Sequence, residues 1–166
     1  PQVQADVRDL LGAVDRSSGS SGWLGDALVA NPGAYDAMIN YEAVVLEANQ
    51  ALTAAGEEPL YLIYPANGLS VADSPLCRIQ KGDAAKDAAF ADLQAHLLSE
   101  DIQQQLLELG RRTGLIGMSA SRAGAIWNPD WGADPGRAIA SVPTPASDVI
   151  EEALRHGTRW VVFESP

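Results

Sequence analysis

The stretch with the clearest chemical potential covers residues 15–25 and reads Asp-Arg-Ser-Ser-Gly-Ser-Ser-Gly-Trp-Leu-Gly. Its four hydroxyls come directly before an apolar run that is typical of a helix. Free N–H groups at a helix N-terminus, together with hydroxyls, bind anions and polar ligands. We therefore expect a ligand site made of Arg16, Ser17, Ser18, Ser20 and Ser21, in which Arg16 neutralises an anion. A flexible Ser/Gly linker or a plain helix cap is the alternative.

Two further places offer polar side chains to a ligand. Tyr41 would supply a hydroxyl or a ring face, and Glu42 would accept a hydrogen bond from an amine or a sugar hydroxyl. Asp73 and Ser74, which precede Pro75, are candidate contacts as well. The alternatives are an ordinary strand aromatic for Tyr41, a first-turn carboxylate favoured by the helix dipole for Glu42, and a turn-making role for Asp73.

The sequence predicts neither catalysis nor a metal or cofactor. The two histidines lie in helical segments, and the run Gly117-Met-Ser-Ala-Ser121 lacks the final glycine of a nucleophile elbow. The run Asp15-Arg-Ser-Ser-Gly19 has glycine where a metal-dependent adhesion motif needs its last serine. We expect a binding or interaction protein rather than an enzyme.

Composition narrows the class of protein. The chain has 166 residues and a formal net charge of −11, which disfavours binding to nucleic acid. Cys77 is the only cysteine, so no internal disulfide forms, and its apolar context indicates a small buried side chain. The sequence shows neither a signal peptide nor an apolar run near the roughly 20 residues of a transmembrane helix.

Hydrophobic periodicity predicts an α/β arrangement. The helical pattern covers 3–14, 23–29, 43–52, 83–98, 99–109 and 147–154, with stop signals at residues 31–33, Gly56 and Gly110. Strands are expected at 38–41, 60–64, 70–79 and 159–164. The flat apolar run 60–64 indicates a fully buried strand, and Pro75 places 70–79 at an edge or interrupts it. The Pro/Gly-rich stretch 111–145 is expected to be functional or to wrap over the surface. It contains Trp127 and Trp131, and two tryptophans in such a stretch more often anchor it to the core than stack on a ligand.

Four motifs in this order resemble the second half of a bacterial extracellular solute-binding protein of the two-lobed type that serves ABC transporters. They are Asp36-Ala-Met-Ile-Asn-Tyr-Glu-Ala-Val-Val, Leu60-Tyr-Leu-Ile-Tyr-Pro-Ala-Asn-Gly, Val71-Ala-Asp-Ser-Pro-Leu-Cys and the helix pair that ends in Leu-Gly-Arg-Arg at Arg112. The likeness is closest to the actinobacterial branch associated with von Willebrand factor A domains. It implies a periplasmic-binding-protein-like lobe of type 2, with a mixed sheet flanked by helices.

The resemblance also implies an organisation and a set of partners. The chain would be one solute-binding-like domain or fragment over 1–166, with part of lobe II at about 1–64, the return to lobe I at about 70–112 and a wrapping tail at 113–166. The first half of lobe I has no counterpart, so apolar surface would be exposed and covered by self-association. The implied setting is extracytoplasmic, secreted or anchored at the cell surface. The implied partners are a small-molecule or anion ligand, a membrane permease and a von Willebrand factor A domain. The alternative function is a structural or protein-interaction domain without a ligand cleft.

Overall fold

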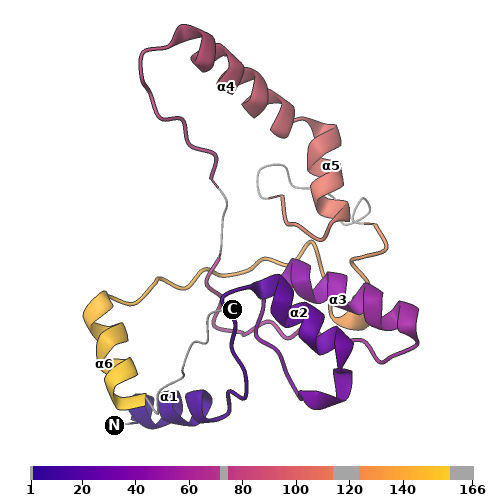
Figure 1. Ribbon diagram of the computed structural model, residues 1–166, viewed down its shortest axis with the longest axis vertical. Helices are drawn as coiled ribbons and strands as arrows, with labels where there is room; N and C mark the ends of the chain where they lie inside the picture. The colour runs from indigo at the N-terminus through magenta and orange to yellow at the C-terminus, as the bar shows by residue number, and fades with distance from the viewer. Residues whose placement is uncertain (1, 72–74, 114–123, 158–166) are drawn as a thin grey trace.

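The computed structural model describes residues 2–71, 75–113 and 124–157, and these are mainly helical (Figure 1). Helices account for 51% and strands for 1% of the described structure. The α-helices are α1 (Gln2–Gly12), α2 (Ser21–Ala30), α3 (Glu42–Ala55), α4 (Ala84–Leu97), α5 (Glu100–Glu108) and α6 (Ser147–Gly157), with 3-10 turns η1 (Pro32–Ala34) and η3 (Pro129–Trp131).

The helix predictions are confirmed, because the local signals that bound each helix act as expected. Asp83 caps α4, and its carboxylate accepts hydrogen bonds from the N–H groups of Ala85 and Lys86. Gly56 follows α3 and Gly110 follows α5, with φ values of 78° and 74° that favour glycine. All six predicted helices are present among the described residues.

The predicted α/β fold class is wrong, because the part of the chain that the structure describes contains no sheet. The segments 38–41 and 60–64 lie outside regular structure, as do the described residues of 70–79. Its one β-contact is an isolated parallel bridge between Leu69 and Ser141. The predicted strand 159–164 lies outside the described residues. An apolar segment becomes a strand only when another segment pairs with it, and the pattern of a single segment carries no information about that neighbour.

One hydrophobic core lies where α3, α5 and the tryptophan-rich stretch meet. Leu46 of α3 is fully buried at its centre, and Leu107 of α5 is 3% exposed. Trp127 and Trp131 are buried in the same cluster, so they pin the Pro/Gly-rich stretch to the core. The core residues are Leu46, Leu62, Leu107, Ile126, Trp127, Trp131 and Ala133.

The remaining helices pack in pairs around or away from this core. Helix α2 lies against α3, α1 lies against α6, and α4 contacts α5 (Figure 1). Gly25 permits the first of these contacts, because a Cβ atom there would lie 2.8 Å from Cγ1 of Val44. Helix α4 has no buried residue and extends away from the core. None of the described helices is both long and apolar enough to cross a membrane.

Gly68 offers a test of the contact between the segments around Leu69 and Ser141. It has φ 109°, and a Cβ atom would lie 2.5 Å from the main-chain oxygen of Ala140. The same oxygen accepts a hydrogen bond from Leu69 N–H, and Leu69 C=O accepts one from Val142 N–H. A side chain at Gly68 would therefore push these two segments apart.

We expect Gly68→Ala to lower the free energy of unfolding by about 1 kcal/mol more than Gly56→Ala does. Gly56 is the matched control, because it also has a positive φ but has open space around its Cα. Urea unfolding followed by tryptophan fluorescence measures both variants. Equal losses would show that the contact between residues 68–69 and 140–142 adds nothing to stability.

Candidate functional site

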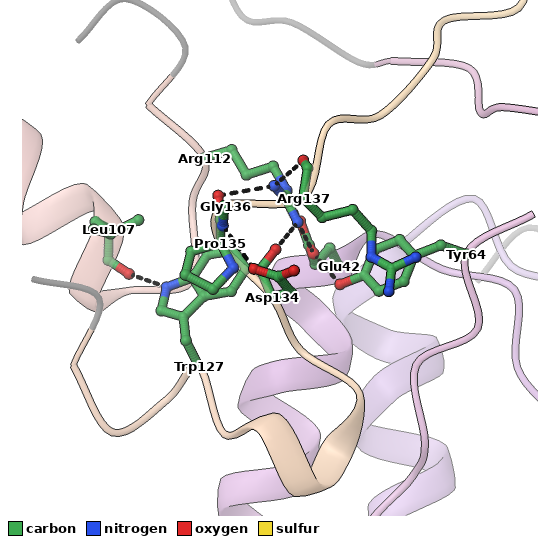
Figure 2. Close-up of polar contacts among 9 residues, drawn as sticks. All are labelled: Glu42, Tyr64, Leu107, Arg112, Trp127, Asp134, Pro135, Gly136 and Arg137. Atoms are coloured by element: carbon green, nitrogen blue, oxygen red, sulfur yellow. Dashed lines mark hydrogen bonds and ion pairs between the residues drawn. The ribbon is translucent and has the colours of Figure 1, made fainter. Parts of the chain in front are cut away.

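The described residues form one dense polar cluster, and Arg112 lies at its centre (Figure 2). Its Nε–H donates to Oε2 of Glu42 over 2.6 Å, and Nη2 donates to Oε1 of Glu42 over 2.8 Å. This is a bidentate ion pair, and both side chains are mostly buried, at 25% and 18% exposed. Such a pair combines charge with fixed geometry, and lysine cannot reproduce it.

Main-chain oxygens from one tight turn accept the other donors of Arg112. Nη2 donates to the oxygen of Asp134, and Nη1 donates to the oxygens of Pro135 and Arg137. The turn is held by its own contacts, because Arg137 N–H donates to Asp134 C=O and Gly136 N–H donates to the Asp134 carboxylate. A guanidinium has five N–H donors, and all five of Arg112 are engaged.

The turn at the end of α5 positions Arg112 beside Glu42 and residues 134–137. Gly110 N–H donates to Leu107 C=O and Arg111 N–H donates to Leu106 C=O, which together form a Schellman motif. The reversal directs the next residue, Arg112, back toward the first turn of α3, where Glu42 begins the helix. Trp127 closes the same region, since its Nε1–H donates to Leu107 C=O over 2.7 Å.

Tyr64 completes the cluster. Its hydroxyl donates to Oε1 of Glu42, and its ring lies 4.7 Å from the guanidinium carbon of Arg137. Burial, followed by the hydrogen bond and the negative charge of Glu42, raises the pKa of Tyr64 to about 12. The hydroxyl therefore stays protonated at neutral pH and remains a donor to Glu42.

A shallow, open depression of about 470 Å³ lies beside the cluster. Tyr61, Trp127 and Arg137 supply its larger side chains, and Asp134 supplies a carboxylate. The guanidinium of Arg112 faces the turn and Glu42 instead and keeps no donor for a ligand. The cluster therefore positions four segments of the chain, and its chemistry is structural.

The serines predicted as ligand contacts are used in local structure. The Ser20 hydroxyl accepts from Trp23 N–H and caps α2, and the Ser18 hydroxyl accepts from Ser20 N–H. Ser21 is the first residue of α2, and its C=O accepts from the side chain of Asn40. Ser17 is exposed. The predicted N-cap alternative accounts for the contact of Ser20, whereas Ser18 makes a local turn contact just before the cap.

The other predicted site residues do not gather around the serines. Arg16 lies over the ring of Trp23 at 5.6 Å. Tyr41 is 55% exposed and precedes α3, whereas Glu42 lies in the Arg112 cluster. Asp73 and Ser74 lie outside the described residues. The depression is lined by none of the predicted ligand contacts.

The segment 60–64 has a second feature, an unpaired edge. Side-chain exposure alternates along it, with Tyr61 69%, Leu62 9% and Ile63 84% exposed. Three inward main-chain groups are bonded, because Leu60 exchanges two hydrogen bonds with the Asn49 side chain and Leu62 N–H donates to Trp131 C=O over 2.8 Å. The main-chain groups of Tyr61 and Ile63 make no hydrogen bond to any described residue. We call these groups and the two exposed side chains the open edge.

Sequence reasoning was wrong in predicting that 60–64 is a fully buried strand, since Tyr61 and Ile63 are exposed, and it missed the Arg112 cluster. Glu42 and Arg112 are 70 positions apart, and no local spacing connects them. The available signals were the glycine stop before Arg111-Arg112 and the turn-forming run Asp134-Pro-Gly-Arg137. Neither signal indicates the other as its partner.

Comparison with known proteins finds no match to this chain among protein-family models, curated proteins or solved structures. Among the described residues, no group of three or more histidine, cysteine, aspartate or glutamate side chains is arranged to hold a metal ion.

We expect Arg112→Met to lower the free energy of unfolding by about 3–5 kcal/mol, because it leaves the Glu42 carboxylate buried without its partner and three carbonyls without a donor. Arg137→Met is the matched control. Its guanidinium is exposed and contacts only a ring face in the described structure, so we expect a loss below about 1 kcal/mol. Urea unfolding measures both variants, and similar losses would contradict the central role of Arg112.

Proposed function

We propose that this chain is a non-catalytic protein-interaction module that binds an extended apolar segment at its open edge. The observation that carries the proposal is the open edge itself, where Tyr61 and Ile63 combine exposed side chains with main-chain groups that no described residue pairs. Unpaired N–H and C=O groups on an extended segment are a template for a further strand.

Rigidity supports this choice of surface. The segment is fixed from behind, because Leu62 lies in the core and Tyr64 bonds to Glu42. It is also tied to α3 through Asn49, whose side chain is fully buried. A docking strand therefore meets a preorganised edge, which lowers the entropic cost of binding.

The chemistry of the edge defines the kind of partner. The run from Pro59 to Pro65 carries no charge, so main-chain hydrogen bonds and apolar side chains dominate the contact. The flanking prolines lack an N–H and limit pairing to the five residues between them. A short, uncharged strand rich in β-branched or aromatic residues fits this edge.

The solute-binding function that the resemblance implies rests on sequence motifs. In the described structure, the serine stretch and Glu42 serve capping and the Arg112 cluster, so neither supports that function. The interaction function is the one that the geometry favours.

A labelled peptide tests the docking edge. The probe is a fluorescein-labelled, capped heptapeptide of alternating valine and threonine, titrated with about 1 µM protein and read by fluorescence anisotropy. We expect saturable binding that Ile63→Lys weakens at least about tenfold, because the lysine places a charge in the apolar contact. N-methylation of alternate peptide amides on the pairing edge should abolish binding, because it removes the N–H donors.

Ile79→Lys is the matched control, because Ile79 is also an exposed isoleucine, at 73%, in the loop before α4. It should leave affinity unchanged. Absence of binding, or binding that tolerates both Ile63→Lys and N-methylation, would refute the docking edge.

A further inference from the structure

The geometry points to a second copy of this chain as the occupant of the open edge, paired antiparallel about a two-fold axis that passes between the Leu62 residues of the two copies. This inference rests on the proposed function, since it names the partner of the same edge. It follows from the hydrogen-bonding capacity of the edge, the character of its two side chains and its charge.

The free main-chain groups are self-complementary. In an antiparallel pair, opposed residues alternate between those that exchange two hydrogen bonds and those that exchange none. No described residue pairs with the main-chain groups of Tyr61 and Ile63, and the N–H of Leu62, between them, is bonded inward. A two-fold axis between the two Leu62 residues therefore places Tyr61 of each copy opposite Ile63 of the other copy. These are two hydrogen-bonded pairs. Four new hydrogen bonds form without disturbing the bond between Leu62 and Trp131.

The same register pairs the exposed side chains favourably. Tyr61 and Ile63 project from the same face of the segment, where they are 69% and 84% exposed. The two-fold arrangement puts each tyrosine across from an isoleucine, and aromatic residues opposite β-branched residues are favourable cross-strand pairs. A self-complementary patch of this kind is what a two-fold interface requires.

Charge favours this segment as the contact between two copies. Each chain carries a net charge of −11, so two copies repel one another at long range, and a contact between them is least costly where both surfaces are uncharged. The residues from Pro59 to Pro65 meet that condition. Because salt screens the repulsion while leaving main-chain hydrogen bonds in place, dimerisation should strengthen as ionic strength rises.

Cysteine cross-linking tests both the partner and the register, in a Cys77→Ser background. The substitution removes the native thiol, which is exposed and not buried as its sequence context predicts. One preparation carries Tyr61→Cys and the other Ile63→Cys. Opposed residues in a hydrogen-bonded pair have Cα atoms about 5.5 Å apart, within the range that a disulfide spans. With an added oxidant, we expect a covalent dimer in the mixture and little in either preparation alone.

Sedimentation at rising concentration should show a dimer that Ile63→Lys weakens at least about tenfold and Ile79→Lys leaves intact.

The outcomes separate this inference from the docking edge. A monomer at all concentrations that still binds the valine–threonine peptide would overturn the second copy as occupant and leave the docking edge in place. A dimer that survives Ile63→Lys, or equal cross-linking of each cysteine variant with itself, would overturn the proposed pairing. Loss of both dimer and peptide binding would overturn both proposals. The buried Trp127 and Trp131 report by fluorescence that each variant is folded.

Discussion

The guanidinium of Arg112 is the constraint on which the described core depends. It joins the start of α3, the segment after α5 and the turn at residues 134–137 through its five donors. A buried ion pair alone is weak evidence of stabilisation, because desolvation offsets much of the attraction. Here the three carbonyl acceptors engage the remaining donors of Arg112, and the Tyr64 hydroxyl donates a third hydrogen bond to Glu42. The cluster therefore fixes which segments meet.

This arrangement explains why the open edge is both rigid and exposed. Tyr64 is held by Glu42 at one end of the segment, and Leu60 is held by Asn49 at the other. Between them, Leu62 enters the core while Tyr61 and Ile63 face outward. A segment fixed in this way keeps Tyr61 and Ile63 facing outward, where the proposed partner can reach them.

The sequence predicted the helices well, because their signals are local. Capping by Asp83, the glycine stops at Gly56 and Gly110, and apolar spacing all act within a few residues. The lack of a sheet in the described residues could not be predicted in the same way. The flat apolar run 60–64 predicts a fully buried strand, yet Tyr61 and Ile63 are exposed, and its bonded inward groups contact the Asn49 side chain and Trp131. The candidate site was missed for the same reason, because Glu42, Tyr64 and Arg112 become neighbours only through the tertiary fold.

Amide hydrogen exchange in the 60–64 segment tests the account most directly. In dilute solution, where the chain is monomeric, we predict slow exchange at Leu62, which bonds to Trp131, and fast exchange at Tyr61 and Ile63. On concentration, exchange at Tyr61 and Ile63 should slow while that at Leu62 stays as it was. Equal protection of all three amides in the dilute protein would contradict the account, because it would mean that the edge is already paired within one chain.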